Sequence, residues 1–304
     1  MSSVDNQIDH IGEMKNTSGV IEKIIQPQSK DLGGFFVRRA IPSVHQKKLG
    51  PWVFIDHFGP HTFPAGEGLD VRPHPHIGLA TVTYLFEGEI LHRDSLGNTL
   101  SVLPGEINLM VAGRGIVHSE RKNPATSTKP LTLHGLQMWL ALPEHLEETE
   151  PAFYHYSKGD IPSVDVNGVN VRLLIGSAYG AISPVQQFFD TLYFEAHLQT
   201  GQCLQLPYAE ERGIYVLSGA LRINDSILPD KTLSILNQDK EIIVEATEDT
   251  CLALIGGEKI GQRFIDWNFV SSKKERIEQA KRDWKENRFD KVKGDEIEFI
   301  PLPE

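Results

Sequence analysis

Residues 84–103 read YLFEGEILHRDSLGNTLSVL, and residues 215–236 read YVLSGALRINDSILPDKTLSIL. Both stretches start with an apolar run led by tyrosine, turn at a glycine, reach an Asp-Ser pair and end in a Thr-Leu-Ser run. The second stretch is two residues longer than the first. Self-similarity of this kind predicts two copies of one unit, in which strand, glycine turn, strand, loop and strand follow one another.

Short runs of β-branched and aromatic residues, separated by Gly, Pro, Asn and Asp, continue on both sides of the repeat from Val20 onward. Many short strands with turn residues between them are typical of an all-β sandwich or barrel. Together with the repeat, they predict two tandem β-barrels. The expected strands are Gly34–Val37, Leu79–Phe86, Ile90–His92, Leu100–Leu103, Asn108–Val111, Val169–Ile175, Leu192–Ala196, Gly213–Leu217, Ala220–Ile223, Leu233–Leu236, Glu241–Glu245 and Cys251–Ile255.

Helical periodicity is confined to the end of the chain. Residues 272–275 read SKKE, a capping-box pattern that marks a helix start. Ile277, Ala280 and Trp284 follow on one helix face. We expect an amphipathic helix over Lys273–Asn287, with Trp284 as a packing anchor.

The charge balance narrows the possible partners. The chain has 304 residues, with 30 Lys and Arg against 41 Asp and Glu, and a formal net charge of −11. Direct binding to nucleic acid is disfavoured, because such binding depends on cationic side chains that neutralise phosphates. Two cysteines, Cys203 and Cys251, indicate neither a disulfide framework nor a cysteine-based zinc site. We expect both to be small buried side chains.

The N-terminal residues lack the basic and apolar regions of a secretory signal. No apolar run approaches the ~18 residues that a membrane-spanning helix needs. We therefore expect a cytoplasmic protein that does not contact the membrane, and a monomer.

Four residues have a spacing with chemical meaning. His74 and His76 lie two residues apart, and so do His118 and Glu120. Residues i and i+2 of a strand share one face, so each pair can point into a barrel interior. Three imidazoles and one carboxylate suit Fe, Mn, Ni, Cu or Zn. On a metal that accepts six ligands, two positions would remain for water, substrate or dioxygen.

The second copy of the unit lacks this set. Gln205 and Pro207 stand in place of the histidine pair, and Cys251 and Ala253 stand close to the positions of the His-Glu pair. We therefore expect four parts: a polar tail at 1–19, a metal-binding N-terminal barrel at 20–145, a C-terminal barrel without a metal site at 146–270, and a helix and tail at 271–304. The expected connector is Pro143–Pro162.

Three further features are interpreted as structural. The glycine-rich stretch at 113–116 lacks the Lys-Ser/Thr pair of a phosphate-binding loop. Arg114 is expected to stabilise its turn, and His92 to lie on the surface rather than at the site.

Motifs around the histidines resemble those of known proteins. The stretch from Gly68 to Gly88 resembles the first cupin motif, and the stretch from Pro104 to His118 resembles an extended second motif. More closely, the chain resembles the pirin family over most of its length. The matching stretches are DHFGP at 56–60, HPHIG at 74–78, PGE at 104–106, AGRGIVHSE at 112–120 and WNFVS at 267–271.

This resemblance implies two tandem cupin barrels of jelly-roll type, with one iron in the N-terminal barrel. Its ligands would be His74, His76, His118 and Glu120, and Fe²⁺ would be the expected ion, with other divalent transition metals possible. Some pirins have a glutamate where this chain has Ala80, a difference that would alter the polarity of the pocket rather than metal binding.

The resemblance also implies a function. The leading hypothesis is a metal-dependent dioxygenase with quercetin 2,3-dioxygenase-type activity on a small aromatic substrate such as a flavonol. The four ligands would then be the catalytic residues, and Glu120 could also accept the substrate hydroxyl proton. The alternative is a non-catalytic, redox-sensing iron protein that modulates a transcriptional or metabolic protein partner. A metal-dependent isomerase of the cupin superfamily is a further alternative.

Overall fold

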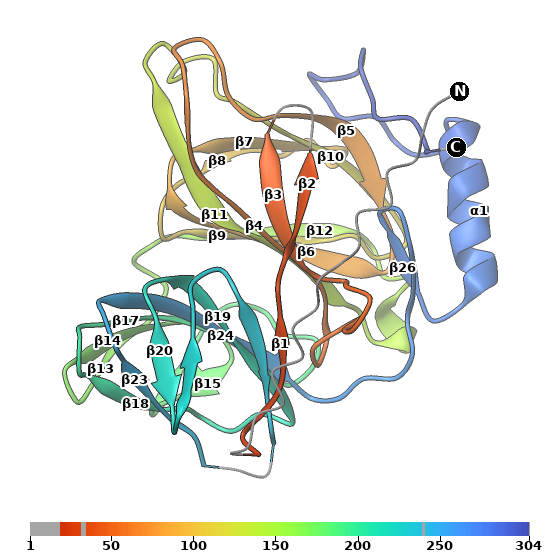
Figure 1. Ribbon diagram of the computed structural model, residues 1–304. Helices are drawn as coiled ribbons and strands as arrows, with labels where there is room; N and C mark the ends of the chain where they lie inside the picture. Colours follow the sequence, from red (N-terminus) through yellow and green to blue (C-terminus); the bar gives the residue numbers. More distant parts are fainter. Residues whose placement is uncertain (1–18, 32–34, 239–240, 304) are drawn as a thin grey trace, which may run out of the picture.

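The computed structural model describes residues 19–31, 35–238 and 241–303, and these form two β-barrels followed by a C-terminal α-helix (Figure 1). Each barrel combines a seven-stranded sheet with a four-stranded sheet, and all named strand pairs are antiparallel. The predicted all-β fold with two tandem units and a C-terminal helix is therefore confirmed.

The first barrel contains one long curved sheet and one small sheet. Its strands are β2 (Gln28–Asp31), β3 (Phe36–Ile41), β4 (Trp52–Phe63), β5 (Asp70–His76), β6 (Leu79–Glu87), β7 (Ile90–Asp94), β8 (Thr99–Val102), β9 (Ile107–Val111), β10 (Ile116–Arg121), β11 (Leu131–Ala141) and β12 (Ala152–Tyr156). The large sheet has the order β12-β9-β6-β11-β4-β3-β2, and the small sheet has the order β5-β10-β7-β8.

The second barrel repeats this plan. Its strands are β1 (Ile21–Ile25), β13 (Ser163–Val166), β14 (Val169–Ile175), β17 (Thr191–Leu198), β18 (Cys203–Gln205), β19 (Glu211–Ser218), β20 (Leu221–Ile223), β21 (Ser226–Leu228), β22 (Leu233–Leu236), β23 (Ile243–Ala246) and β24 (Thr250–Gly257). The large sheet has the order β1-β22-β19-β24-β17-β14-β13, and the small sheet has the order β18-β23-β20-β21. A two-stranded ribbon of β15 (Ser177–Ala178) and β16 (Ala181–Ile182) is added to it.

Strand order shows which parts of the sequence repeat are structurally equivalent. By position in the sheets, β6 corresponds to β19, so Tyr84 and Tyr215 are counterparts, as the repeat predicts. The later match of residues 99–103 with 232–236 is wrong, because residues 99–102 form β8 whereas 233–236 form β22, the counterpart of β9. The turn between β20 and β21 is shorter than the turn between β7 and β8. Residues after this turn in the second barrel therefore no longer align with their structural counterparts in the first.

The same shift corrects the expected counterparts of the His-Glu pair. His118 and Glu120 lie in β10, whose counterpart is β23 at Ile243–Ala246, not β24, which contains Cys251 and Ala253. The counterpart of β5 is β18, so the placement of Gln205 opposite the histidine pair agrees with the sheet order.

The two large sheets pack face to face, and we call the layer between them the seam. One apolar cluster contains Tyr84 and Leu136 of the first barrel together with Tyr193, Tyr215 and other residues of the second. The barrels also exchange edge strands across the expected limit between residues 145 and 146. β1 pairs with β22 of the second barrel, and β12, inside the expected connector, pairs with β9 of the first.

Polar bonds across the seam are reciprocal. The Tyr84 hydroxyl donates to Glu195 Oε2 at 2.5 Å, so a tyrosine of the first barrel bonds to the second. The counterpart Tyr215 lies with its hydroxyl 3.0 Å from His57 Nδ1 in the opposite direction. The repeated tyrosine therefore connects the barrels twice.

The C-terminal segment returns to the first barrel, as its blue trace shows in Figure 1. It forms β25 (Phe264–Asp266), β26 (Phe269–Ser271) and α1 (Lys274–Lys285), and Phe269 makes a bridge to Ile77 beside β5. The predicted capping box is wrong, because the cap residue Lys273 makes no side-chain cap bond. The hydroxyl of Ser272 instead donates to Glu147, a residue that follows the short 3₁₀ helix η1 (Glu144–Leu146).

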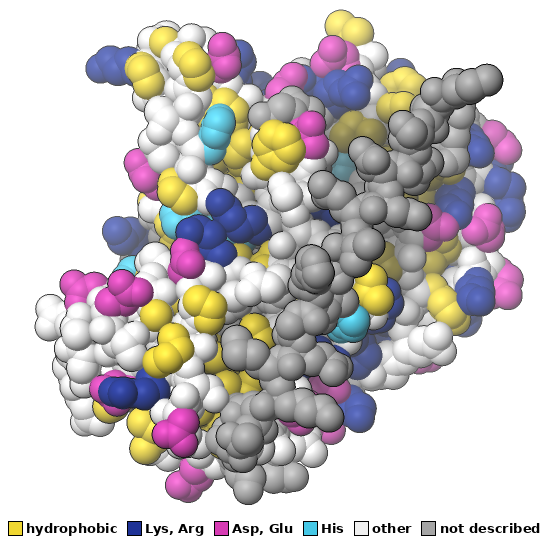
Figure 2. All heavy atoms as spheres, viewed as in Figure 1, with side chains coloured by type: hydrophobic (Ala, Val, Ile, Leu, Met, Phe, Trp, Pro, Cys, Tyr) yellow, Lys and Arg dark blue, Asp and Glu magenta, His cyan; other side chains and the backbone are white. Residues whose placement is uncertain are grey.

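Two surface properties follow from the described residues. None of the helices in the described ranges is long and apolar enough to cross a membrane. On the face drawn in Figure 2, cationic and anionic side chains are interspersed over the coloured part of the surface.

Candidate metal centre and its pocket

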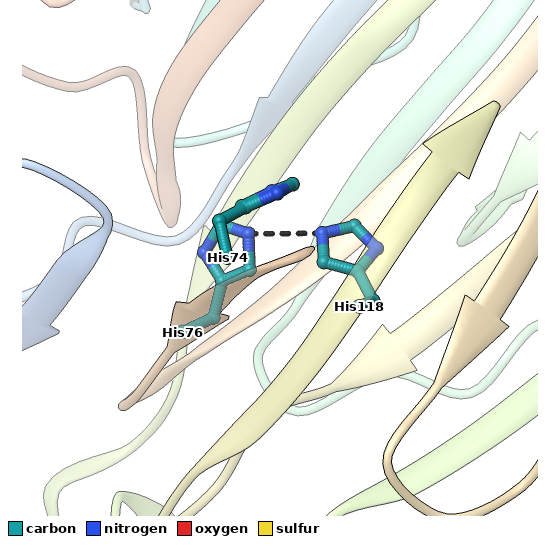
Figure 3. Close-up of side chains that lie close together, drawn as sticks. All are labelled: His74, His76 and His118. Atoms are coloured by element: carbon teal, nitrogen blue, oxygen red, sulfur yellow. Dashed lines mark hydrogen bonds between the residues drawn. The ribbon is translucent and has the colours of Figure 1, made fainter. Parts of the chain in front are cut away.

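The three candidate histidines lie together inside the first barrel. His74 and His76 share one face of β5, and the antiparallel register places His118 of β10 directly opposite His74. All three are buried, and one ring nitrogen from each lies within 4.8 Å of the others. Figure 3 shows the rings of His76 and His118 facing each other, with their Nε2 atoms 3.1 Å apart.

The sequence of β5 explains why this strand can present two histidines. Pro73 and Pro75 alternate with them, and proline has no amide hydrogen to donate to a sheet. β5 is the edge strand of the small sheet, where one side of the backbone needs no partner strand. Because successive residues of a strand point to opposite faces, the two histidines point into the barrel and the two prolines lie on the other face.

Backbone carbonyls orient two of the rings. His74 Nδ1 lies 2.8 Å from the carbonyl oxygen of Arg72, and His76 Nδ1 lies 3.1 Å from that of Asn268. A carbonyl oxygen only accepts, so each Nδ1 carries the hydrogen and each Nε2 keeps a free lone pair. Hydrogen bonds of this kind fix the tautomer and orientation of histidines that bind metals.

Burial keeps the three rings uncharged. Loss of hydration lowers the pKa of His74 to about 4, and lowers the pKa values of His76 and His118 well below the usual range. Three neutral imidazoles whose ring nitrogens lie this close together are suited to a divalent cation. His118 Nδ1 is buried without a hydrogen-bond partner in the described structure. The residues present fit a transition metal.

Glu120 lies beside the histidines, but its carboxylate has other partners. The amide nitrogen of Gln137 donates to both carboxylate oxygens, at 3.0 and 3.1 Å, and the hydroxyl of Thr83 lies 3.4 Å from one of them. A register shift separates His118 from Glu120 in the pairing with β5. The ring nitrogens of the three histidines lie within 4.8 Å of one another, and the Glu120 carboxylate is not part of that group. Burial raises the pKa of Glu120.

A cavity of about 400 Å³ opens at the centre, and His74, His76 and Glu120 form part of its wall. Most of the wall is apolar. Phe54 and Trp139 stack with ring centroids 3.9 Å apart, and Trp139 and His76 form a T-shaped pair with centroids 5.1 Å apart. The cavity is therefore lined mainly by apolar and aromatic side chains, and it lies beside the group of potential metal ligands.

Comparisons with known proteins place the chain in a family. Residues 34–140 match the family model described as Pirin, and residues 193–290 match the Pirin C-terminal cupin domain. A pirin-like protein from Caulobacter vibrioides is 42% identical over 94% of this chain and 100% of its own length. The chain belongs to the pirin family. Its two barrels are accordingly cupin domains, as the motifs predicted.

Solved structures are similar to this chain over most of its length. A quercetin 2,3-dioxygenase from Acinetobacter baumannii is 32% identical with a TM-score of 0.86, covering 93% of this chain and 95% of its own. A second quercetin 2,3-dioxygenase structure from the same organism is 28% identical with a TM-score of 0.81, covering 88% and 97%.

Residues that the sequence did not identify complete the pirin pocket. Trp267, Asn268 and Ile300 line the cavity, although they follow the second barrel in the chain. Arg39 forms a two-pronged ion pair with Asp56, at 2.8 and 2.7 Å, and its guanidinium lies over the Phe54 ring. The matching stretches at 56–60 and 267–271 include Asp56, Trp267 and Asn268, but the sequence did not assign them to the pocket, because distant segments meet only in the folded chain.

Three expectations about nearby residues have a clear outcome. Arg114 is exposed, and its side chain pairs with Glu150, which lies outside its own turn. His92 is not a surface residue: it is buried, lies 3.1 Å from Asp94 and stacks on Phe153. The expected burial of both cysteines is wrong, since Cys203 is exposed and Cys251 is only half-buried.

Proposed function

We propose that this pirin is a metal-dependent dioxygenase that cleaves a flavonol such as quercetin, with iron as its metal. The observation that carries this proposal is an aromatic cavity of about 400 Å³ with His74 and His76 in its wall. These two histidines belong to the buried group of three that His118 completes. Similarity to a quercetin 2,3-dioxygenase at 32% identity over 93% of the chain supports the same activity.

The ligands in this proposal are His74, His76, His118 and Glu120. When bound, the metal supplies Lewis acidity and open positions for a substrate oxygen and dioxygen. The histidines bind it through nitrogens whose orientation the Arg72 and Asn268 carbonyls help to fix. A shift of the Glu120 carboxylate from Gln137 toward the histidines would complete the set.

Residues of the pocket would perform the remaining steps. The Glu120 carboxylate would also accept the hydroxyl proton of the flavonol, a second role open to a carboxylate ligand. The stacked rings of Phe54 and Trp139 would orient the flat substrate, and the apolar walls would exclude water.

A second candidate is a non-catalytic iron protein that reports its redox state to a protein partner. The observation in its favour is Arg121, which follows Glu120 in β10. Its guanidinium pairs with Asp70 of β5 and with Asp295 and Glu298 of the C-terminal segment. A change at the centre could therefore reach an exposed part of the molecule.

Oxygen uptake during flavonol turnover separates the two candidates. Iron-reconstituted protein would be compared with the His118→Ala variant, and with His145→Ala as a matched control because His145 is an exposed residue of η1. The enzyme proposal expects turnover that is lost in His118→Ala and kept in His145→Ala. Protein that holds iron but consumes no oxygen with flavonols would reject flavonol cleavage and favour the second candidate.

A further inference from the structure

A second group of metal-ligand side chains lies at the seam, outside the histidine centre. Glu195 and His197 share one face of β17, and His197 pairs in register with Cys251 of β24. One potential ligand atom from each residue lies within 4.8 Å of the others. The strand register therefore brings together a carboxylate, an imidazole and a thiol on one face of the sheet.

The three residues differ in how firmly they are held. Glu195 is buried, and its Oε2 accepts the hydroxyl hydrogen of Tyr84 from the first barrel at 2.5 Å. Its other oxygen contacts His197 Nε2. The His197 side chain is 56% exposed, and Cys251 Sγ lies 3.9 Å from its Nε2. One ligand is thus anchored, while the imidazole can turn toward an incoming ion.

The group is open to solvent. His197 and Cys251 line a surface hollow of about 480 Å³, and Asn170, Gln202 and Asp249 form other parts of its wall. A metal ion could therefore enter, and the side away from Glu195 would leave a position for water. Zinc binds the imidazole nitrogen of histidine, carboxylate oxygen and the thiolate of cysteine, and zinc sites that keep an open position have three protein ligands.

We propose that Glu195, His197 and Cys251 form a second metal site, selective for a thiophilic divalent ion such as Zn²⁺. Binding would replace the thiol hydrogen of Cys251 and the hydrogen shared by His197 and Glu195, and both protons would pass to solvent. The site is separate from the histidine centre and does not depend on the flavonol-cleaving activity. Tyr84 links it to the first barrel, so an ion there would strengthen the contact between the barrels.

Cobalt binding tests the proposal, because a cysteine thiolate on Co²⁺ gives a charge-transfer absorption band that histidine and carboxylate do not. The starting chain would be the full-length His76→Ala, His118→Ala variant, so that Co²⁺ binding reports the seam. We expect one Co²⁺ per chain and a thiolate band. Both should be lost in Cys251→Ser or His197→Ala, whereas Cys203→Ser, which changes the exposed second cysteine, should retain both.

Alkylation of the unmodified chain provides a test that does not require the double variant to fold. At a Zn²⁺ concentration ~100 times the dissociation constant, the free Cys251 thiol and its alkylation rate should fall about 100-fold. Cys203 should react at an unchanged rate. The proposal is overturned if Co²⁺ gives no thiolate band, if Cys251→Ser keeps the band, or if Zn²⁺ leaves Cys251 as reactive as before.

Discussion

Thr83 and Tyr84 are neighbours on β6 whose side chains contact two different carboxylates on opposite faces of the same sheet. The Thr83 hydroxyl lies 3.4 Å from Glu120 in the pocket and 2.7 Å from the Gln137 side-chain oxygen. The Tyr84 hydroxyl bonds Glu195 across the seam. Because successive residues of a strand point to opposite faces, β6 separates the metal centre from the seam while it contributes to both.

Because Thr83 and Tyr84 support different carboxylates, substitutions at these two neighbouring positions should have different effects. Thr83→Val should weaken metal binding at the histidine centre, because it loosens the support of Glu120, with little loss of stability. Tyr84→Phe should leave that metal affinity unchanged, but it should lower the free energy of unfolding by about 1.5–3 kcal/mol, since a buried carboxylate loses a donor. Chelator competition and chemical denaturation measure the two effects. Equal effects of both changes on metal affinity would contradict this assignment.

Gln137 tests the role of Glu120 more directly. Its amide donates to both oxygens of Glu120, so Gln137→Leu should release and misorient the carboxylate. If Glu120 is a metal ligand, the metal affinity should fall by about 10–100-fold, as for other residues that orient metal ligands. Gln186→Leu, which changes an exposed glutamine outside both sites, is the control. An unchanged affinity in Gln137→Leu would remove Glu120 from the ligand set.

Gly78 limits how the C-terminal segment can close the pocket. It has a φ of +66°, and a Cβ at this position would lie 2.0 Å from the carbonyl oxygen of Val270. Gly78→Ala should therefore displace the segment and lower stability by more than the ~1–2 kcal/mol of left-handed strain alone. Gly66→Ala is a matched control, since Gly66 has a φ of +85° and open space around it. Equal losses in the two variants would show that the segment is not displaced.

Acid should weaken the seam through His57. Burial, with added repulsion from His134, Arg38 and Lys231, lowers the pKa of His57 to about 3. A histidine in the unfolded chain has a pKa near 6.5. Between about pH 3 and pH 6.5, therefore, His57 binds a proton in the unfolded chain but not in the folded chain. Stability should thus be retained above about pH 6.5 and fall on acidification below it, by up to about 1.4 kcal/mol per pH unit.

Denaturation at pH 7 and pH 5 measures this loss. We expect His57→Gln to have a smaller pH dependence than the unchanged protein, even if it is less stable at pH 7. His145→Gln should keep the full dependence, because that residue is exposed. A pH dependence that is the same in all three proteins would show that His57 is not responsible.

Local sequence patterns determined the fold class and most of the histidine centre. Strands could be predicted because the pattern of apolar and polar residues along a strand is local to the sequence. The repeat that begins with Tyr84 and Tyr215 correctly indicated two similar barrels. The i, i+2 spacing of His74 and His76 placed both on one strand face for the same reason. The resemblance to family motifs also predicted that His118 lies with these two histidines. The pairing of β5 with β10 places His118 opposite His74.

Tertiary structure alone decided the rest, because it depends on contacts between segments far apart in the chain. The Asn268 carbonyl that orients His76, and Ile300 in the pocket wall, come from the far end of the sequence. Burial of His92 depends on Phe153 of β12, a strand that the sequence assigned to a connector. Cys251 resembled an isolated thiol in the sequence, and only strand pairing places it beside His197 and Glu195. Spacing along a chain specifies which face a side chain takes, whereas its partners depend on how the sheets pair and pack.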